Sequence, residues 1–212
     1  MTTNLPFSQA CENNKEPILE RLREIFDAPG KVLEIGTGTG QHAVHFANAM
    51  PHLQWQPTDH PDAAELCHPR LEHAGLPNIL PIIELDVATA QWPVKSFTWA
   101  FSANTAHIMA WPEVEEMFRK IGERLPKHGA FCLYGPFNNQ GRHSSESNRQ
   151  FDQHLRARSS RMGIRDLDDL CALAESAGLT LAENCAMPAN NRLLIFSALS
   201  TGTSGSVDSA GL

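Results

Sequence analysis

Residues 32–41 read Val-Leu-Glu-Ile-Gly-Thr-Gly-Thr-Gly-Gln, and this stretch decides the fold. We expect a short buried strand at 31–35, a turn at 36–40 and a helix at 41–50. Glycine tolerates positive φ and lets the backbone pass close to a ligand, and a helix N-terminus offers unpaired N–H groups. The stretch therefore predicts a ligand-binding turn, although a tight turn that needs glycine for geometry alone would look the same.

On either side of this turn, apolar patterns of strand length alternate with patterns of helix length. Further strands are expected at 53–56 (ending at Asp59), 78–85 (ending at Asp86), 98–103, 130–134, 179–187 and 192–199, and further helices from about 14 onward, at 112–125 and at 166–177. Such alternation predicts an α/β fold. We expect a Rossmann-like, mostly parallel seven-stranded sheet with an antiparallel edge hairpin and helices on both faces.

Composition narrows the class of protein. The chain has 212 residues with a net charge of −7, which argues against nucleic acid and anionic membranes as partners. Its five cysteines are scattered and form no metal-binding or disulfide pattern. No signal peptide or membrane span is expected, so we predict a cytoplasmic protein. One domain is expected at 1–199, with an insertion at 138–165 acting as a lid and a disordered Ser/Gly-rich tail at 200–212.

The glycine turn matches neither of two common phosphate-binding patterns. A dinucleotide fingerprint needs a sixth-position glycine, where this chain has Gln41, and a P-loop needs Lys and Ser or Thr after its last glycine. Glu34 would also repel a pyrophosphate but would attract a cation. The pattern resembles motif I of class I S-adenosylmethionine (SAM) methyltransferases, in which Gly36, Thr37, Gly38 and Gly40 would lie against the ligand.

The next strand ends carry further polar candidates. Asp59 can accept hydrogen bonds from both ribose hydroxyls. In the superfamily that the pattern resembles, the position of Asp86 contacts the adenine amino group and the next N–H, that of Val87, contacts the ring. Each carboxylate alone would pass for a solvated loop residue, but three at successive strand ends favour SAM. A nicotinamide cofactor also has a ribose that Asp59 could bind, so this cofactor remains the alternative.

The later strand ends suggest the catalytic side of the site. Asn104 and His107 follow the fourth expected strand, where the transferred methyl should lie, so Asn104 is assigned to the cofactor and His107 to the general base. Tyr134 ends the fifth strand and is either a pocket residue or a core residue. The alternative is that His107 is a buried, hydrogen-bonded histidine with a structural role only.

The 138–165 insertion is basic, with six arginines against two acids. Arginine binds carboxylate and phosphate in a bidentate manner, so the insertion is expected either to hold an anionic acceptor or to be a solvated cover.

The chain closely resembles the methyltransferase-like 26 family, also known as domain of unknown function 938. The resemblance runs over about residues 13–197 and rests on 14–18, 36–43, 55–59, 85–87, Asn104 with His107, 134–137, 147–148, 151–152, 155–156, Gly163, 165–166 and 187–191. It implies a class I methyltransferase that binds SAM and releases S-adenosylhomocysteine. Its remaining polar positions are our substrate candidates: Lys15, Tyr134, Asn148, Arg156, Arg165, Asn190 and Asn191, with Asp152 as the second candidate base.

We therefore predict transfer of a methyl group, by in-line displacement, to a small polar or anionic acceptor. The alternative is a SAM-binding regulatory or scaffold protein without catalysis, and a nicotinamide oxidoreductase ranks third. No metal site is expected, because the histidines form no ligand pattern. A small-molecule substrate is the expected partner, and the sequence does not predict an oligomeric state.

Overall fold

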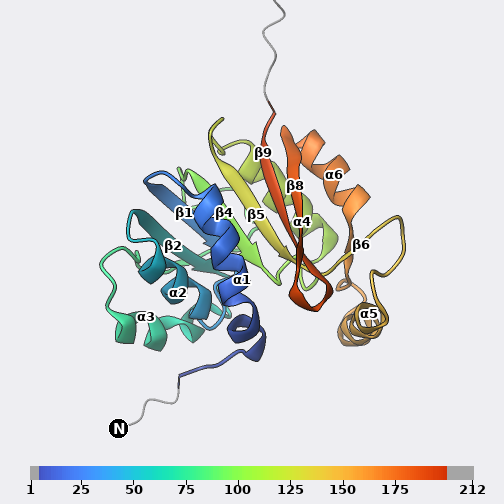
Figure 1. The fold of residues 1–212 in the computed structure, drawn as a ribbon, viewed down its shortest axis with the longest axis horizontal. Helices are drawn as coiled ribbons and strands as arrows, with labels where there is room; N and C mark the ends of the chain where they lie inside the picture. The colour runs from blue at the N-terminus through green and yellow to red at the C-terminus, as the bar shows by residue number, and fades with distance from the viewer. Residues whose placement is uncertain (1–4, 200–212) are drawn as a thin grey trace, which may run out of the picture.

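A computed structural model describes residues 5–199, and the tail predicted at 200–212 lies outside them. Its centre is a seven-stranded sheet (Figure 1). The strands are β1 (Gly30–Ile35), β2 (Leu53–Asp59), β3 (Ile83–Glu84), β4 (Trp99–Ala103), β5 (Ala130–Gly135), β8 (Leu179–Met187) and β9 (Asn191–Ala198). The expected fold class is confirmed.

The strand order is β3-β2-β1-β4-β5-β9-β8. The first five of these strands are parallel, and β9 pairs antiparallel with both β5 and β8. The chain runs outward from β1 through β2 to β3 and then returns to place β4 on the other side of β1. The carboxyl ends of β1 and β4 thus form the point where the strand order reverses, which is where ligands bind in open α/β sheets.

Helices cover both faces of the sheet. They are α1 (Gln9–Ile25), α2 (Gln41–Ala49), α3 (His68–Ala74), α4 (Trp111–Gly122), α5 (Glu146–Arg158) and α6 (Leu167–Ser176), with short 3₁₀ turns η1 (Ala64–Leu66) and η2 (Pro188–Asn190). Helices α1 and α2 pack on one face around Leu22, Phe46 and Trp55. Helices α4 and α6 pack on the other around Phe118 and Leu170. Alternating strand residues supply both cores, as Val32 and Leu33 show.

Two elements differ from their predicted form. Helix α1 begins at Gln9, because the hydroxyl of Ser8 accepts a hydrogen bond from the N–H of Cys11, so Pro17 lies inside the helix and not in its first turn. Pro17 leaves the carbonyl of Asn13, an exposed residue, without an intrahelical donor. Strand β3 is only two residues long, because the pairing of residues 78–80 with Trp55 forms an isolated bridge at Ile79 that does not continue into it.

The insertion at 138–165 forms more structure than the single short helix expected from its pattern. It holds α5 and contributes to a small two-stranded sheet, β6 (Phe137–Asn138) with β7 (Arg165–Asp166). In Figure 1 α5 lies beyond the carboxyl ends of the strands, at the bottom of the view. Its function as a lid and the predicted domain limits of 1–199 stay predictions. Within residues 5–199 no helix is long and apolar enough to cross a membrane.

Candidate functional site

The glycine turn has the backbone geometry that its sequence predicts. Gly36, Gly38 and Gly40 have φ values of +78°, +58° and +74°. A Cβ on Gly36 would overlap the Thr105 side chain, whereas a Cβ on Gly38 would meet nothing within 4 Å. The turn is therefore packed against the protein at Gly36 and open at Gly38, which leaves room for a ligand beside its backbone.

Glu34 lies beneath this turn and braces it. Its Oε2 accepts hydrogen bonds of 2.9 Å from Thr37 Oγ1 and from Trp55 Nε1, and the residue is only 2% exposed. Burial raises the pKa of Glu34 to about 7, against the effect of these two hydrogen bonds. Glu34 thus joins the Thr37 side chain of the turn to Trp55 of β2. Its predicted contact with a cationic ligand stays a prediction.

Asp59 joins the turn to the end of β2. Its Oδ2 accepts a hydrogen bond of 2.6 Å from the N–H of Gly38, and its Oδ1 accepts one of 2.8 Å from the N–H of His60. Asp86 follows β3, and its Oδ1 accepts a hydrogen bond of 2.9 Å from the N–H of Ala88. Both carboxylates are half-buried and keep further acceptor capacity toward the space between them.

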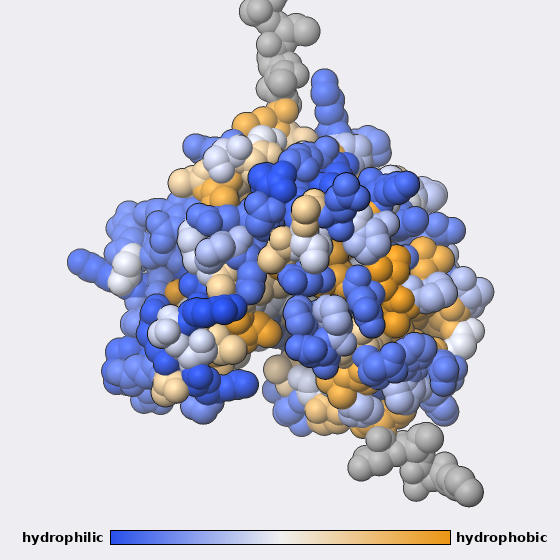
Figure 2. All heavy atoms as spheres, turned by 180° about the vertical axis from the view of Figure 1, so that it is seen from behind, coloured by the Kyte–Doolittle hydropathy of each residue, from blue (hydrophilic) through white to orange (hydrophobic). Residues whose placement is uncertain are grey.

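One cleft is lined by four of the predicted cofactor residues, Gly36, Asp59, Asp86 and Val87, whereas Glu34, Thr37, Gly38, Gly40 and Asn104 do not line it. Its cavity volume is about 190 Å³, and it is lined by Ile35, Gly36, Asp59, His60, Leu85, Asp86, Val87, Thr105, Ile108, Met109 and Glu113. Apolar side chains form most of its walls, and the two aspartates supply polar groups at one side. The lower edge of the molecule, where the parallel strands end, is notched in the space-filling view (Figure 2).

Asn104 and His107 lie beside this cleft, at the end of β4. Asn104 has a φ of +60° and its N–H donates to the carbonyl of Tyr134 at 2.9 Å. A Cβ placed on Gly135 would lie 3.8 Å from His107 Nδ1 and 4.0 Å from Asn104 Oδ1, so both side chains converge on this glycine. The structure thus groups the candidate base with the expected methyl position.

His107 is held in a neutral state. It is 6% exposed, and its ring meets that of Phe151 edge-to-face at a centroid distance of 5.2 Å. Burial lowers the pKa of His107 to about 4, and the charge of Arg165 contributes in the same direction. A neutral imidazole can accept a proton, which is what a general base requires.

Arg165 shapes the loop that carries His107. Its Nε donates to the carbonyl of Ala106 at 2.9 Å, its Nη2 donates to the carbonyls of Met109 and Arg161, and its guanidinium lies over the Trp111 ring. These contacts use the Nε and Nη2 groups with which Arg165 would bind a substrate, the role that the sequence predicts. The geometry therefore favours a structural role for Arg165.

Asp152 and Arg156 are paired with each other. Arg156 Nε donates to Asp152 Oδ2 at 2.8 Å, and the N–H of Ile164 donates to Oδ1 at 2.7 Å. Burial raises the pKa of Asp152, but these hydrogen bonds outweigh it and leave the pKa below its ordinary value. An acid held ionised with both oxygens engaged is a poor base, so Asp152 is better explained as a clamp between α5 and the loop at 163–164.

Asn148, Asn190 and Asn191 tie α5 and the β8–β9 turn to the body of the protein. Asn148 Nδ2 donates to Ser144 Oγ at 2.7 Å and to the carbonyl of Asn190 at 3.1 Å. Asn191 hydrogen-bonds to the hydroxyl of Tyr134. Asn148 thus joins α5 to the β8–β9 turn.

Tyr134 lies at the centre of a buried network. Its hydroxyl hydrogen-bonds to Asn14 and Asn191, and His42 Nε2 lies 2.7 Å from Asn14 Oδ1. Burial raises the pKa of Tyr134 and lowers that of His42 to about 4. Because Tyr134 is only 2% exposed, it joins α1, α2, β5 and β9 and offers little surface to a substrate.

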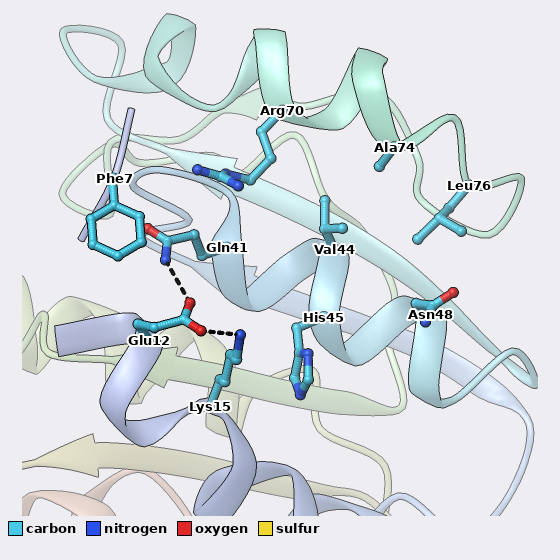
Figure 3. Close-up of a pocket in the computed structure, with 10 residues that line it drawn as sticks. All are labelled: Phe7, Glu12, Lys15, Gln41, Val44, His45, Asn48, Arg70, Ala74 and Leu76. Atoms are coloured by element: carbon cyan, nitrogen blue, oxygen red, sulfur yellow. Dashed lines mark hydrogen bonds and ion pairs between the residues drawn. The ribbon is translucent and has the colours of Figure 1, made fainter. Parts of the chain in front are cut away.

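Lys15 lies apart from the cleft, in a groove between α1, α2 and α3 (Figure 3). Its Nζ contacts Glu12 Oε1 at 2.5 Å, and Gln41 Nε2 donates to Glu12 Oε2 at 3.4 Å. Gln41 also binds Ser8, which fastens the N-terminal segment to the end of the glycine turn. The structure therefore separates Lys15 from the other substrate candidates.

Sequence reasoning missed several residues that build the site. Trp55 donates to Glu34, Thr105 packs on Gly36, and Ile108 and Met109 form a wall of the cleft. Only Trp55 lay in a stretch that the family resemblance had marked. In the part of the chain that the structure describes, no group of three or more His, Cys, Asp or Glu side chains could hold a metal ion.

Comparisons with known proteins point in one direction. A family model described as "Protein of unknown function (DUF938)" matches residues 5–198. An L-tyrosine C(3)-methyltransferase of Streptomyces lavendulae is 25% identical over 124 residues, which is 57% of this chain and 33% of that protein. The chain thus spans about a third of this curated relative.

Solved structures confirm the fold. An O-methyltransferase family protein from Burkholderia thailandensis matches with a TM-score of 0.77 at 16% identity, covering 88% of this chain and 57% of the other. The structure of PigF with SAH matches with a TM-score of 0.74 at 17% identity, covering 88% of this chain and 56% of the other.

Proposed function

This chain belongs to the family described as "Protein of unknown function (DUF938)", and from that premise we propose that it is a SAM-dependent methyltransferase. The narrower placement among methyltransferase-like 26 proteins is part of this proposal. The observation that carries it is the cleft at the strand-order reversal, where an open glycine turn faces Asp59 and Asp86. The likeness in fold to methyltransferase structures and the similarity to a methyltransferase of Streptomyces lavendulae support it.

The residues of the cleft fit SAM. The space beside Gly38 admits a ligand against the backbone, and the N-terminus of α2 follows directly. Asp59 would hold the ribose hydroxyls, and Asp86 with the N–H of Val87 would hold the adenine. Leu85, Ile108 and Met109 supply the apolar walls that a flat ring requires. The product S-adenosylhomocysteine (SAH) would be held by the same groups.

When bound, SAM supplies an electrophilic methyl group on a sulfonium. The chain has to align an acceptor, keep water out and remove a proton where the acceptor is a neutral oxygen or nitrogen. Asn104 and His107 lie where the acceptor would enter, and neutral His107 is our candidate base. We infer a small polar or anionic acceptor, because α5 and the β8–β9 turn close over this end of the sheet.

A non-catalytic SAM-binding protein is the second candidate. A scaffold needs the cofactor cleft but no base beside it. The position of His107, which converges with Asn104 on Gly135 at the end of β4, favours catalysis.

Calorimetric titration of the protein with SAM, SAH and NAD⁺ tests the cofactor. We expect micromolar binding of SAM and SAH, and about 10–100-fold weaker binding in Asp59→Ala, because a charged hydrogen-bond acceptor is lost. Asp62→Ala is the matched control, since that exposed side chain lies three residues on and outside the cleft. Binding of NAD⁺ in preference to SAM, or of neither, would contradict the proposal.

A further inference from the structure

A second cavity lies beyond the end of β5, on the side of β8 and β9. Its volume is about 630 Å³, and its walls include Phe137, Arg142, His143, Leu167, Asn184 and Arg192. They come from β6, the loop before α5, the start of α6 and the β8–β9 hairpin. The topology thus brings residues from four parts of the chain around one space.

The charge of this cavity has one sign. None of the residues that line it is an Asp or a Glu, although the whole chain carries a net charge of −7. The carboxylate of Asp152 approaches one wall residue, with Oδ2 at 4.0 Å from His143 Nε2, and it is already bound by Arg156 and Ile164. The carboxylate of Asp166 accepts from the N–H groups of Gly141 and Asp168.

Arg192 is fixed in place without a carboxylate partner. Its Nε donates to Asn184 Oδ1 at 2.5 Å and its Nη2 donates to the carbonyl of Asn184 at 2.8 Å. Both acceptors are neutral, so the positive charge stays uncompensated while the guanidinium is held in one orientation. A pre-oriented guanidinium loses little conformational entropy when it binds an anion.

Arg142 is available in a different way. Its backbone pairs with Asn139 in both directions, at 2.9 and 3.0 Å, and its side chain makes no hydrogen bond or ion pair within residues 5–199. The other arginines of the insertion that the structure pairs are committed: Arg149 to Glu146, Arg156 to Asp152 and Arg161 to Glu113. Arg165, like Arg192, donates to neutral acceptors, but neither Arg156 nor Arg165 lines this cavity. Here the anion-binding role predicted for them therefore passes to Arg142 and Arg192.

Phe137 connects this cavity to the candidate catalytic group. It lines the cavity, and a Cβ placed on Gly135 would lie 3.8 Å both from the tip of the Phe137 ring and from His107 Nδ1. Phe137 is 4% exposed and packs in the core, so one buried side chain adjoins both the cavity and the glycine that His107 approaches.

We propose that this cavity binds the carboxylate or phosphate group of the methyl acceptor, through Arg142 and Arg192. That the ligand is the methyl acceptor rests on the proposed methyltransferase function. That the ligand is an anion rests on the cavity alone. The amides of Asn138 and Gln140 also line the cavity and suit the polar body of such a molecule. Charge-assisted bidentate contacts to arginine supply the selectivity for an anion.

Titration with inorganic phosphate and with succinate, at constant ionic strength, tests the anion site and separates the two sources of negative charge. We expect one of them to bind the wild-type protein, and Arg142→Gln and Arg192→Gln each to weaken this binding at least tenfold. Arg158→Gln is the matched control, because Arg158 is an exposed arginine at the end of α5 and does not line the cavity. Arg142→Gln changes only an exposed turn residue, so it still tests anion binding if Arg192→Gln folds poorly.

Two outcomes would overturn the inference. One is equal anion binding by the wild type and both cavity variants, and the other is an equal loss in Arg158→Gln. SAH titration of the same variants separates the two proposals, since we expect unchanged SAH affinity in all of them. Weak SAH binding by the wild type would refute the proposed function and leave the anion result intact.

Measurement of methyl transfer is the final test of this inference. Small hydroxy and amino carboxylates are compared with their methyl esters, with SAH formation as the readout. Arg192→Gln should raise the KM of the acids at least tenfold and leave that of the esters unchanged. An equal effect on acids and esters would contradict the assignment of the cavity to the acceptor.

Discussion

At the scale of single residues, the site depends on side chains whose burial sets their charge. His107 is neutral because it is buried and lies near the cationic Arg165, and both effects lower its pKa. Asp152 shows the opposite case, in which hydrogen bonds fix a carboxylate as an anion. One position suits proton transfer and the other suits structure.

We predict that His107 titrates near pH 4 in the folded protein, not near 6.5, in histidine NMR spectra. Because the folded pKa is depressed, the neutral base is fully present above pH 6.5 and is lost only as pH falls through about 4. Methyl transfer should therefore show no loss from His107 protonation between pH 8 and 6. A signal that titrates near 6.5 and disappears in His107→Asn would contradict this prediction.

His107→Ala should lower methyl transfer about 10²-fold or more, which is the usual contribution of a general base. SAH affinity should not change, because His107 does not line the cofactor cleft. The control is His154→Ala, which removes an exposed imidazole from α5. Full activity of His107→Ala would show that the acceptor needs no base at this position.

At the scale of elements, the loop after β3 depends on a buried lysine in α4. Lys120 is fully buried, and its Nζ donates to the carbonyl of Val87 at 3.2 Å and to that of Thr89. Its Nζ also lies 3.3 Å from Glu116 Oε2 and over the Trp92 ring. Helix α4 thus holds the loop that carries Asp86 and Val87, and Lys120 is a positioning residue.

We predict that Lys120→Met, which nearly preserves volume, leaves those carbonyls without a donor. Its free energy of unfolding should fall by about 1–3 kcal/mol, and amide hydrogen exchange should accelerate at 86–92. SAH affinity should fall more than the turnover number does. Lys127→Met serves as control, since Lys127 is exposed. Unchanged amide hydrogen exchange at 86–92 would show that the loop keeps its conformation without Lys120.

At the scale of the whole molecule, the proposed cofactor cleft lies at the strand-order reversal, and the proposed anion cavity lies on the side of β8 and β9. The cleft draws on β1, β2 and the loops after β3 and β4, whereas the cavity draws on the insertion and the β8–β9 hairpin. Different halves of the sheet thus serve different parts of the proposed reaction.

Hydrogen exchange should show this division. SAH should slow exchange at 36–40, 86–88 and 105–109 together, because one ligand contacts three segments, and leave 142–144 unchanged. Phosphate or succinate should protect 142–144 and leave 36–40 unchanged. Protection of both regions by either ligand alone would show that the two sites are one.

The sequence by itself determined the sheet, the glycine turn and the strand ends that carry Asp59 and Asp86. These features follow from local pattern: continuous apolar runs of strand length, backbone that needs glycine, and the rule that parallel strands end at one edge. The limits of α1 and β3 were less predictable, because they depend on single contacts, the Ser8 cap and the isolated bridge between Trp55 and Ile79.

Only the tertiary structure decided which polar side chains are paired and which cavity each one lines. Arg156 is paired with Asp152, Arg165 donates to the Ala106 carbonyl, and Lys15 lies in another groove, whereas Arg142 and Arg192, 50 positions apart in the sequence, line one cavity. A charged side chain shows its type in the sequence. Whether its charge is already compensated depends on neighbours that only long-range packing supplies.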